Sequence, residues 1–86
     1  MAEICRFYGL IIRMYVDDHN PPHFHVYYNE FSAQIGINDL GIIGGKLPPK
    51  ALSLVVEWAV THHDELKKNW ELAKINKPII KIEPLR

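Results

Sequence analysis

Three of the five histidines in the chain, His19, His23 and His25, lie within a span of seven residues. Imidazole exchanges a proton near neutral pH and also binds transition metals through a ring nitrogen. The run that contains them, residues 17–25, reads Asp-Asp-His-Asn-Pro-Pro-His-Phe-His. Because it combines imidazoles with carboxylates, this run is the first candidate for a functional site.

The residues after the proline pair are predicted to form a strand. Apolar or aromatic side chains at positions 24, 26 and 28 alternate with His23, His25 and Tyr27, which is the period of a half-buried strand over residues 23–29. Side chains two positions apart on a strand share a face and lie about 6.6 Å apart along it. The imidazoles of His23 and His25 are therefore expected side by side on the polar face.

A second strand is predicted just before the histidine run, over residues 10–17. Its even positions are all apolar, whereas Arg13, Tyr15 and Asp17 lie on the opposite face. The Asn-Pro-Pro turn ends this strand because proline has no amide donor. A tight connection makes the two strands neighbours and places Arg13 and Tyr15 opposite the histidines. One face of the sheet is thus expected to be apolar, and the other to carry Arg, His, Tyr and Asp side chains.

Acid–base chemistry on a phosphodiester is one hypothesis for this polar face. One imidazole of the His23 and His25 pair accepts a proton while the other donates one, and Arg13 binds the phosphate. His19 is an auxiliary residue in this scheme, which requires no metal and no cofactor. The predicted catalytic residues are therefore His23, His25, Arg13 and His19.

Two other hypotheses stay open for the same residues. His-x-His on a strand is a usable pair of metal ligands, which Asp17, Asp18 or His19 would complete. Alternatively the histidines are structural, with His19 bonding backbone groups of the turn and His23 and His25 lying on a solvated face. Spacing does not choose between these hypotheses because it fixes no third ligand.

The remaining elements complete an α+β fold. A third strand is predicted over residues 31–37 and a fourth strand or irregular edge over residues 40–47. An amphipathic helix is predicted over residues 49–74, followed by a short strand or partner-binding arm over residues 79–85. Short links favour an antiparallel meander of three to four strands, packed on one long C-terminal helix.

The predicted helix carries two further histidines and two tryptophans. His62 interrupts the apolar stripe, so we expect a core histidine that is hydrogen-bonded to a strand-face partner. The alternative is that the helix brings His62 to the histidine run as a fourth imidazole. His63 is expected on the solvent side, and Trp58 and Trp70 are expected to be core or interface residues.

Composition is that of one ordinary soluble domain, expected to comprise residues 1–86. The 10 basic and 10 acidic side chains cancel, yet residues 1–65 carry a net charge of −4 and residues 66–86 a net charge of +4. The single cysteine, Cys5, excludes an internal disulfide. No apolar run approaches the roughly 20 residues of a membrane span, so a cytoplasmic location is expected.

Two sets of residues resemble a known family. The first set comprises residues 7–15 and 18–25, and its most specific part is the string His-Asn-Pro-Pro-His-Phe-His. The second set comprises Gly45-Lys46-Leu47-Pro48, Glu57-Trp58-Ala59, His62, Glu65-Leu66 and Asn69-Trp70. Together they resemble the small bacterial proteins called domain of unknown function 4160, over nearly the whole chain. The resemblance implies no settled activity and no catalytic residues. It does imply a neighbouring small family, domain of unknown function 2442, with which such proteins are assigned to candidate toxin–antitoxin pairs.

These expectations combine into one functional hypothesis. The chain is a component of a toxin–antitoxin module that acts on RNA through its His- and Arg-rich sheet face, with a small antitoxin-like protein as partner and no membrane association. A homodimer stays open. The alternative is a non-enzymatic adaptor that binds a small partner protein by helix docking or by strand addition, at an exposed strand edge or through the arm at residues 79–85.

Overall fold

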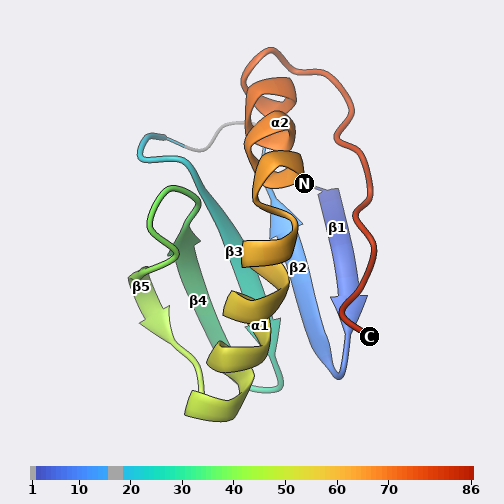
Figure 1. Ribbon diagram of the computed structural model, residues 1–86. Helices are drawn as coiled ribbons and strands as arrows, with labels where there is room; N and C mark the ends of the chain where they lie inside the picture. The colour runs from blue at the N-terminus through green and yellow to red at the C-terminus, as the bar shows by residue number, and fades with distance from the viewer. Residues whose placement is uncertain (1, 16–18) are drawn as a thin grey trace.

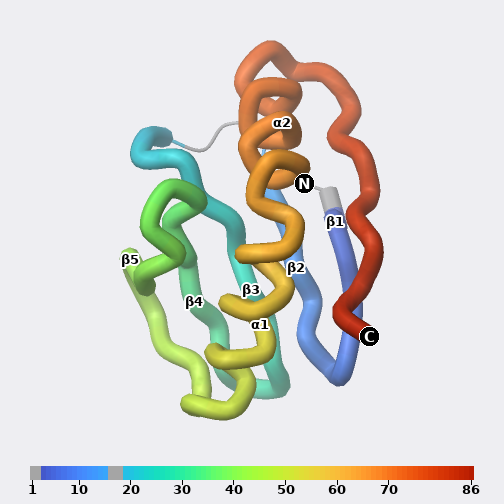
Figure 2. The backbone as a smooth tube through the Cα atoms, viewed as in Figure 1, coloured from blue at the N-terminus to red at the C-terminus, as the bar shows by residue number. Residues whose placement is uncertain are grey.

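The protein has two layers, a sheet and the helices that cover one of its faces (Figure 1, Figure 2). Its computed structural model describes residues 2–15 and 19–86. Over these residues the chain forms strands β1 (Ala2–Phe7), β2 (Leu10–Met14), β3 (His23–Tyr28), β4 (Phe31–Gly36) and β5 (Ile42–Lys46), followed by helices α1 (Pro49–Thr61) and α2 (His63–Lys74). The predicted α+β class is confirmed.

The sheet is an antiparallel meander, as the short links predict. Its strand order is β1-β2-β3-β4-β5, so each strand pairs with its neighbours in the sequence. In β3, Phe24 and Val26 are fully buried. His25 and Tyr27, which alternate with them along the strand, are half-buried. Over residues 24–27, the alternation of apolar and polar residues therefore predicts correctly which side chains of β3 face the helices.

A tight hairpin turn adds a strand that the sequence pattern does not predict. Tyr8 and Gly9 have φ angles of 48° and 81° and join Phe7 to Leu10, which are paired residues of β1 and β2. Two consecutive positive φ angles are the geometry of a two-residue hairpin turn. Gly9 is thus part of the turn between two strands. It is not a bulge or bend within one continuous strand.

Strand β1 lacks a readable alternation because its pairing with β2 is irregular. The register shifts between Glu3 and Cys5, and the two successive residues Ile4 and Cys5 are both buried. A bulge of this kind turns two neighbouring side chains toward the same face. The expectation of three to four strands is therefore wrong. The sheet has five strands, and the one that the sequence pattern does not predict is β1.

The single helix predicted over residues 49–74 is divided at His62. This residue has φ −111° and ψ 28°, outside the helical range. Next to it, Thr61 Oγ1 donates a hydrogen bond to the carbonyl oxygen of Glu57 at 3.3 Å, a contact that bends helices. The His62 amide still bonds the Trp58 carbonyl, so α1 and α2 follow one another closely (Figure 1). Among the described residues, no helix combines the length and apolar character that crossing a membrane requires.

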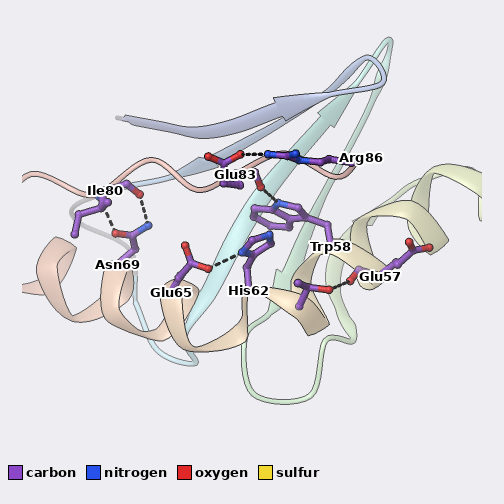
Figure 3. Close-up of polar contacts among 9 residues, drawn as sticks. Glu57, Trp58, His62, Glu65, Asn69, Ile80, Glu83 and Arg86 are labelled. Carbon is purple, nitrogen blue, oxygen red and sulfur yellow. Dashed lines mark hydrogen bonds and ion pairs between the residues drawn. The ribbon is translucent and has the colours of Figure 1, made fainter.

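The C-terminal residues 75–86 form neither a strand nor a free arm. They run alongside β1 (Figure 1), where the Ile82 amide donates to the Ile4 carbonyl at 3.1 Å. Ile82 is itself buried, and Trp58 Nε1 donates to the Glu83 carbonyl at 2.8 Å (Figure 3). The expectation of a strand over residues 79–85 is wrong, because the segment has no strand geometry and packs on its own domain. A partner-binding role for it stays a prediction.

Asn69 of α2 holds the same segment with both ends of its amide (Figure 3). Its Nδ2 donates to the Ile80 carbonyl and its Oδ1 accepts from the Ile80 amide, both at 2.8 Å. Asn69 is 1% exposed, so its amide group has little access to water as an alternative partner. The two bonds fix the direction in which the chain leaves α2.

Replacing Asn69 by alanine is expected to lower the free energy of unfolding by about 1–3 kcal/mol, because two hydrogen bonds are lost together. Urea denaturation followed by tryptophan fluorescence measures this change. Ser53→Ala, which removes an exposed hydrogen bond to the Lys50 carbonyl, is the control and should change stability by less than about 0.5 kcal/mol. Equal effects for the two variants would show that Asn69 does not hold the C-terminal segment.

Candidate functional site

The sheet face opposite α1 and α2, which we call the outer face, carries four of the polar residues predicted for it: Arg13, Tyr15, His25 and Tyr27. Its centre is a row of cross-strand partners, in which Arg13 of β2 pairs with His25 of β3 and His25 pairs with Gln34 of β4. Directly opposed residues on neighbouring strands have Cβ atoms about 4.5–5.5 Å apart. The predicted position of Arg13 opposite the histidine strand is therefore confirmed.

Three rings and one guanidinium on the outer face contact one another. The hydroxyl groups of Tyr15 and Tyr27 are hydrogen-bonded at 2.6 Å. The ring of Tyr15 meets the imidazole of His25 edge-on, with centroids 4.5 Å apart and an interplanar angle of 84°. The guanidinium carbon of Arg13 lies 5.5 Å from the centre of the Tyr27 ring, within cation–π range. The four side chains thus form one connected polar and aromatic surface.

A shallow hollow of about 330 Å³ adjoins His25 and Tyr27 over strands β4 and β5. On the β5 side it is lined by Gly44, the partner of Gln34, which presents no side chain to this face, and by Gly45. Gly45 has a φ of 73°, and a Cβ there would lie 2.2 Å from the Ser32 carbonyl oxygen, so only glycine fits. Gln34 on the same wall supplies an amide that can both donate and accept hydrogen bonds.

His23 is brought close to His25, but it is not on a solvated face. The two imidazole centroids are 5.1 Å apart, and the His23 centroid also lies 5.4 Å from that of the Trp70 ring. His23 is only 7% exposed, and its Nδ1 donates to the Pro21 carbonyl at 2.8 Å. The prediction of a solvated pair is wrong for His23 because α2 covers the start of β3. Any proton transfer by His23 would therefore use Nε2.

The other residues of the histidine run contribute less to this geometry. His19 is exposed in the connection between β2 and β3. Asp17 and Asp18 lie outside the described residues. In residues 2–15 and 19–86, no group of three His, Cys, Asp or Glu side chains is arranged to hold a metal ion.

The two helix histidines make contacts of their own. His62 packs on Trp58 with centroids 5.7 Å apart, and its Nδ1 contacts the Glu65 carboxylate at 2.5 Å (Figure 3). The expectation that His62 bonds a strand-face partner is thus wrong, because its hydrogen bond is to Glu65 of α2. His63 Nε2 donates to the Ile37 carbonyl at 2.8 Å. This half-buried bond to the end of β4 replaces the expected solvent position of His63.

Charged groups beside the outer face are paired within β1. Arg6 NH2 lies 2.8 Å from the Glu3 carboxylate, and Glu3 is the cross-strand partner of Arg13. The hydrogen bond from Arg6 lowers the pKa of Glu3, with smaller contributions from the positive charges of Arg6, Lys81 and Arg13. Cys5 offers no nucleophile here, because burial raises the pKa of its thiol.

Sequence reasoning did not identify Gln34, Gly44 and Gly45 as part of the site. Gln34 lies at a polar position between the inward-facing Ala33 and Ile35, so the alternation of residues 31–37 already indicates that it faces outward. No sequence signal shows that the glycines of β5 leave space beside His25. That arrangement depends on the pairing of β4 with β5.

One comparison with known proteins gives a match. A model of the family described as Domain of unknown function (DUF4160) matches residues 9–71, which include Arg13, His19, His23, His25 and Tyr27. No curated protein matches the chain, and no solved structure does. The family match spans more than half of the chain and agrees with the resemblance of the histidine run. The chain belongs to the family of the Domain of unknown function (DUF4160).

Proposed function

We propose that the protein binds single-stranded RNA on its outer face and acts on it as a component of a toxin–antitoxin module. The observation that carries this proposal is the connected set of Arg13, Tyr15, His25 and Tyr27 on the face that the helices leave open. The toxin–antitoxin context is the expectation attached to the family resemblance. A small antitoxin-like protein is the corresponding partner.

The chemistry of the outer face matches the two parts of a single-stranded RNA. Unpaired bases expose flat faces that stack on aromatic side chains, and phosphates form charge-assisted bonds with arginine. Tyr15, Tyr27 and His25 supply rings, and Arg13 supplies the cation beside them. The hollow beside His25 offers space for a base, with Gln34 in position to bond its edge.

The same geometry supports cleavage of the bound strand as a second step. A phosphate bound by Arg13 lies next to His25, because the two residues are direct cross-strand partners. In this reaction one imidazole removes the proton of the ribose 2′-hydroxyl, the 2′-oxygen attacks phosphorus, and the bond to the 5′-oxygen breaks. The second imidazole protonates the departing 5′-oxygen, leaving a 2′,3′-cyclic phosphate. His25 and His23 are the two imidazoles, 5.1 Å apart.

An adaptor role is the second candidate, and the edge strand β5 favours it. Within the part of the chain that the structure describes, β5 pairs only with β4, and its Ile42 and Ile43 are 42% and 47% exposed. An edge of this kind accepts a further strand from a partner. Residues 79–85 are already hydrogen-bonded to β1 and α2, so this proposal assigns strand addition to β5. Replacing Ile43 by lysine therefore tests the adaptor role, because it places a charge on the strand edge at which a partner strand would bind.

Arg13→Gln is expected to weaken binding of a fluorescein-labelled single-stranded RNA by about tenfold, because one phosphate contact is lost. The slope of log affinity against log salt concentration should fall in magnitude by about 0.7. Fluorescence anisotropy titrations at several salt concentrations measure both changes. Lys77→Gln, which removes the same charge from an exposed position after α2, is the control and should leave affinity within about twofold. Equal losses for the two variants would contradict binding on the outer face.

His25→Asn is expected to slow RNA cleavage by about 100-fold or more and to weaken RNA binding by only about tenfold, because the ring also contributes to the binding surface. Cleavage is followed by gel electrophoresis in the presence of EDTA, and the products are tested for 2′,3′-cyclic phosphate ends. Growth inhibition upon induced expression should be abolished by the double replacement of His23 and His25 with alanine, with folding checked by circular dichroism. Unchanged cleavage or unchanged inhibition would exclude the acid–base mechanism and leave RNA binding to be decided by the Arg13 comparison.

A further inference from the structure

A second hollow in the described part of the chain lies away from the outer face. Its volume is about 490 Å³, and it is formed where the β1–β2 turn, the end of β3, the start of α1 and residues 85–86 come together. This is the lower end of the molecule in Figure 1. Pockets of 300–1,000 Å³ are the usual size for small-molecule sites.

One side of the hollow is apolar. Its lining includes Tyr8, Tyr28, Leu54 and Leu85, and Tyr8 is 61% exposed. The Tyr28 ring also lies over the turn, since its Cε1 is 3.4 Å from where a Cβ of Gly9 would be. An aromatic or aliphatic group placed here would remove these side chains from water, which favours binding.

Positive charge borders the apolar surface. Lys50 lies in the first turn of α1, and Arg86 lines the hollow from the C-terminal segment. That first turn contains no acidic residue, and Pro48 makes no side-chain capping bond. A lysine near the positive end of a helix dipole is in an unfavourable place, and a bound anion offsets that. Glu57 also lines the hollow, two turns further along α1.

Tyr8 is held in a strained conformation. Its φ of 48° places a bulky residue in the left-handed region, where asparagine and glycine are the usual residues of such a turn. The turn itself does not need a tyrosine, because Gly9 and the pairing of Phe7 with Leu10 already close it. Strain of this kind is retained where a side chain has a task. The exposed ring that it positions is one wall of the hollow.

We propose that this hollow is a binding site for a small amphipathic anion, a molecule with an aromatic or aliphatic body and one carboxylate, sulfonate or phosphate group. The body packs between Tyr8, Tyr28 and Leu54, and the anionic group lies at Lys50. This site is separate from Arg13 and His25 and does not depend on the RNA proposal.

Two fluorescent probes of nearly the same shape test the site in the full chain. 1-Anilinonaphthalene-8-sulfonate carries an anionic group, and N-phenyl-1-naphthylamine lacks it. Saturable binding of the sulfonate to the folded protein is expected, with competition by octanoate. Lys50→Gln should weaken sulfonate binding by about threefold and leave binding of the neutral probe within about twofold. An equal effect on both probes would contradict an anion site at Lys50.

Tyr8→Asn separates binding from folding. It should weaken binding of both probes by about tenfold, because a wall of the site is removed. Its thermal midpoint should be unchanged or up to about 5 °C higher, because the strain is relieved. Val60→Asn, which removes a 63% exposed apolar side chain elsewhere on α1, is the control and should bind both probes as the wild type does. No saturable binding up to about 1 mM, or the same loss in the Val60 variant, would overturn the proposal.

Discussion

The burial of Phe24 and Val26 beneath the helices determines which side chains of β3 lie on the outer face. Both side chains are fully buried, and the Phe24 ring meets Trp58 of α1 with centroids 6.1 Å apart. Because side chains alternate across a strand, a slip of one residue would bury His25 and Tyr27 and expose this apolar pair. The cost of that exchange keeps His25 and Tyr27 on the outer face, where they meet Arg13 and Tyr15.

The break at His62 determines how α2 reaches the end of the sheet. His62 bonds Glu65 in α2 and packs on Trp58 in α1, so its side chain joins the two helices across the break (Figure 3). His63 then bonds the carbonyl of Ile37, the residue just after β4. These contacts bring Trp70 against His23. The helical histidines are therefore positioning residues for the layer that covers the start of β3.

The sequence predicts those features that depend on local alternation and fails where tertiary packing decides. The antiparallel meander and the pairing of Arg13 with His25 follow from period-two patterns and short links. The strand Ala2–Phe7 was missed because a bulge hides its alternation, and the break at His62 was missed because the apolar stripe continues across it. The burial of His23 was equally inaccessible, since it depends on a ring that lies 47 positions further along the chain.

The surface that would bind RNA and the pair that would cleave it share only one residue. Tyr27 contacts both Tyr15 and Arg13, and Tyr15 contacts His25. None of these three contacts involves His23. His23 instead belongs to the packing of α2, through Trp70, and to the turn, through the Pro21 carbonyl. The proposed RNA binding therefore depends on side chains of the sheet, whereas the proposed acid–base chemistry also depends on α2, which packs against His23. A partner that shifted α2 would change the surroundings of His23 and with them the proposed cleavage step.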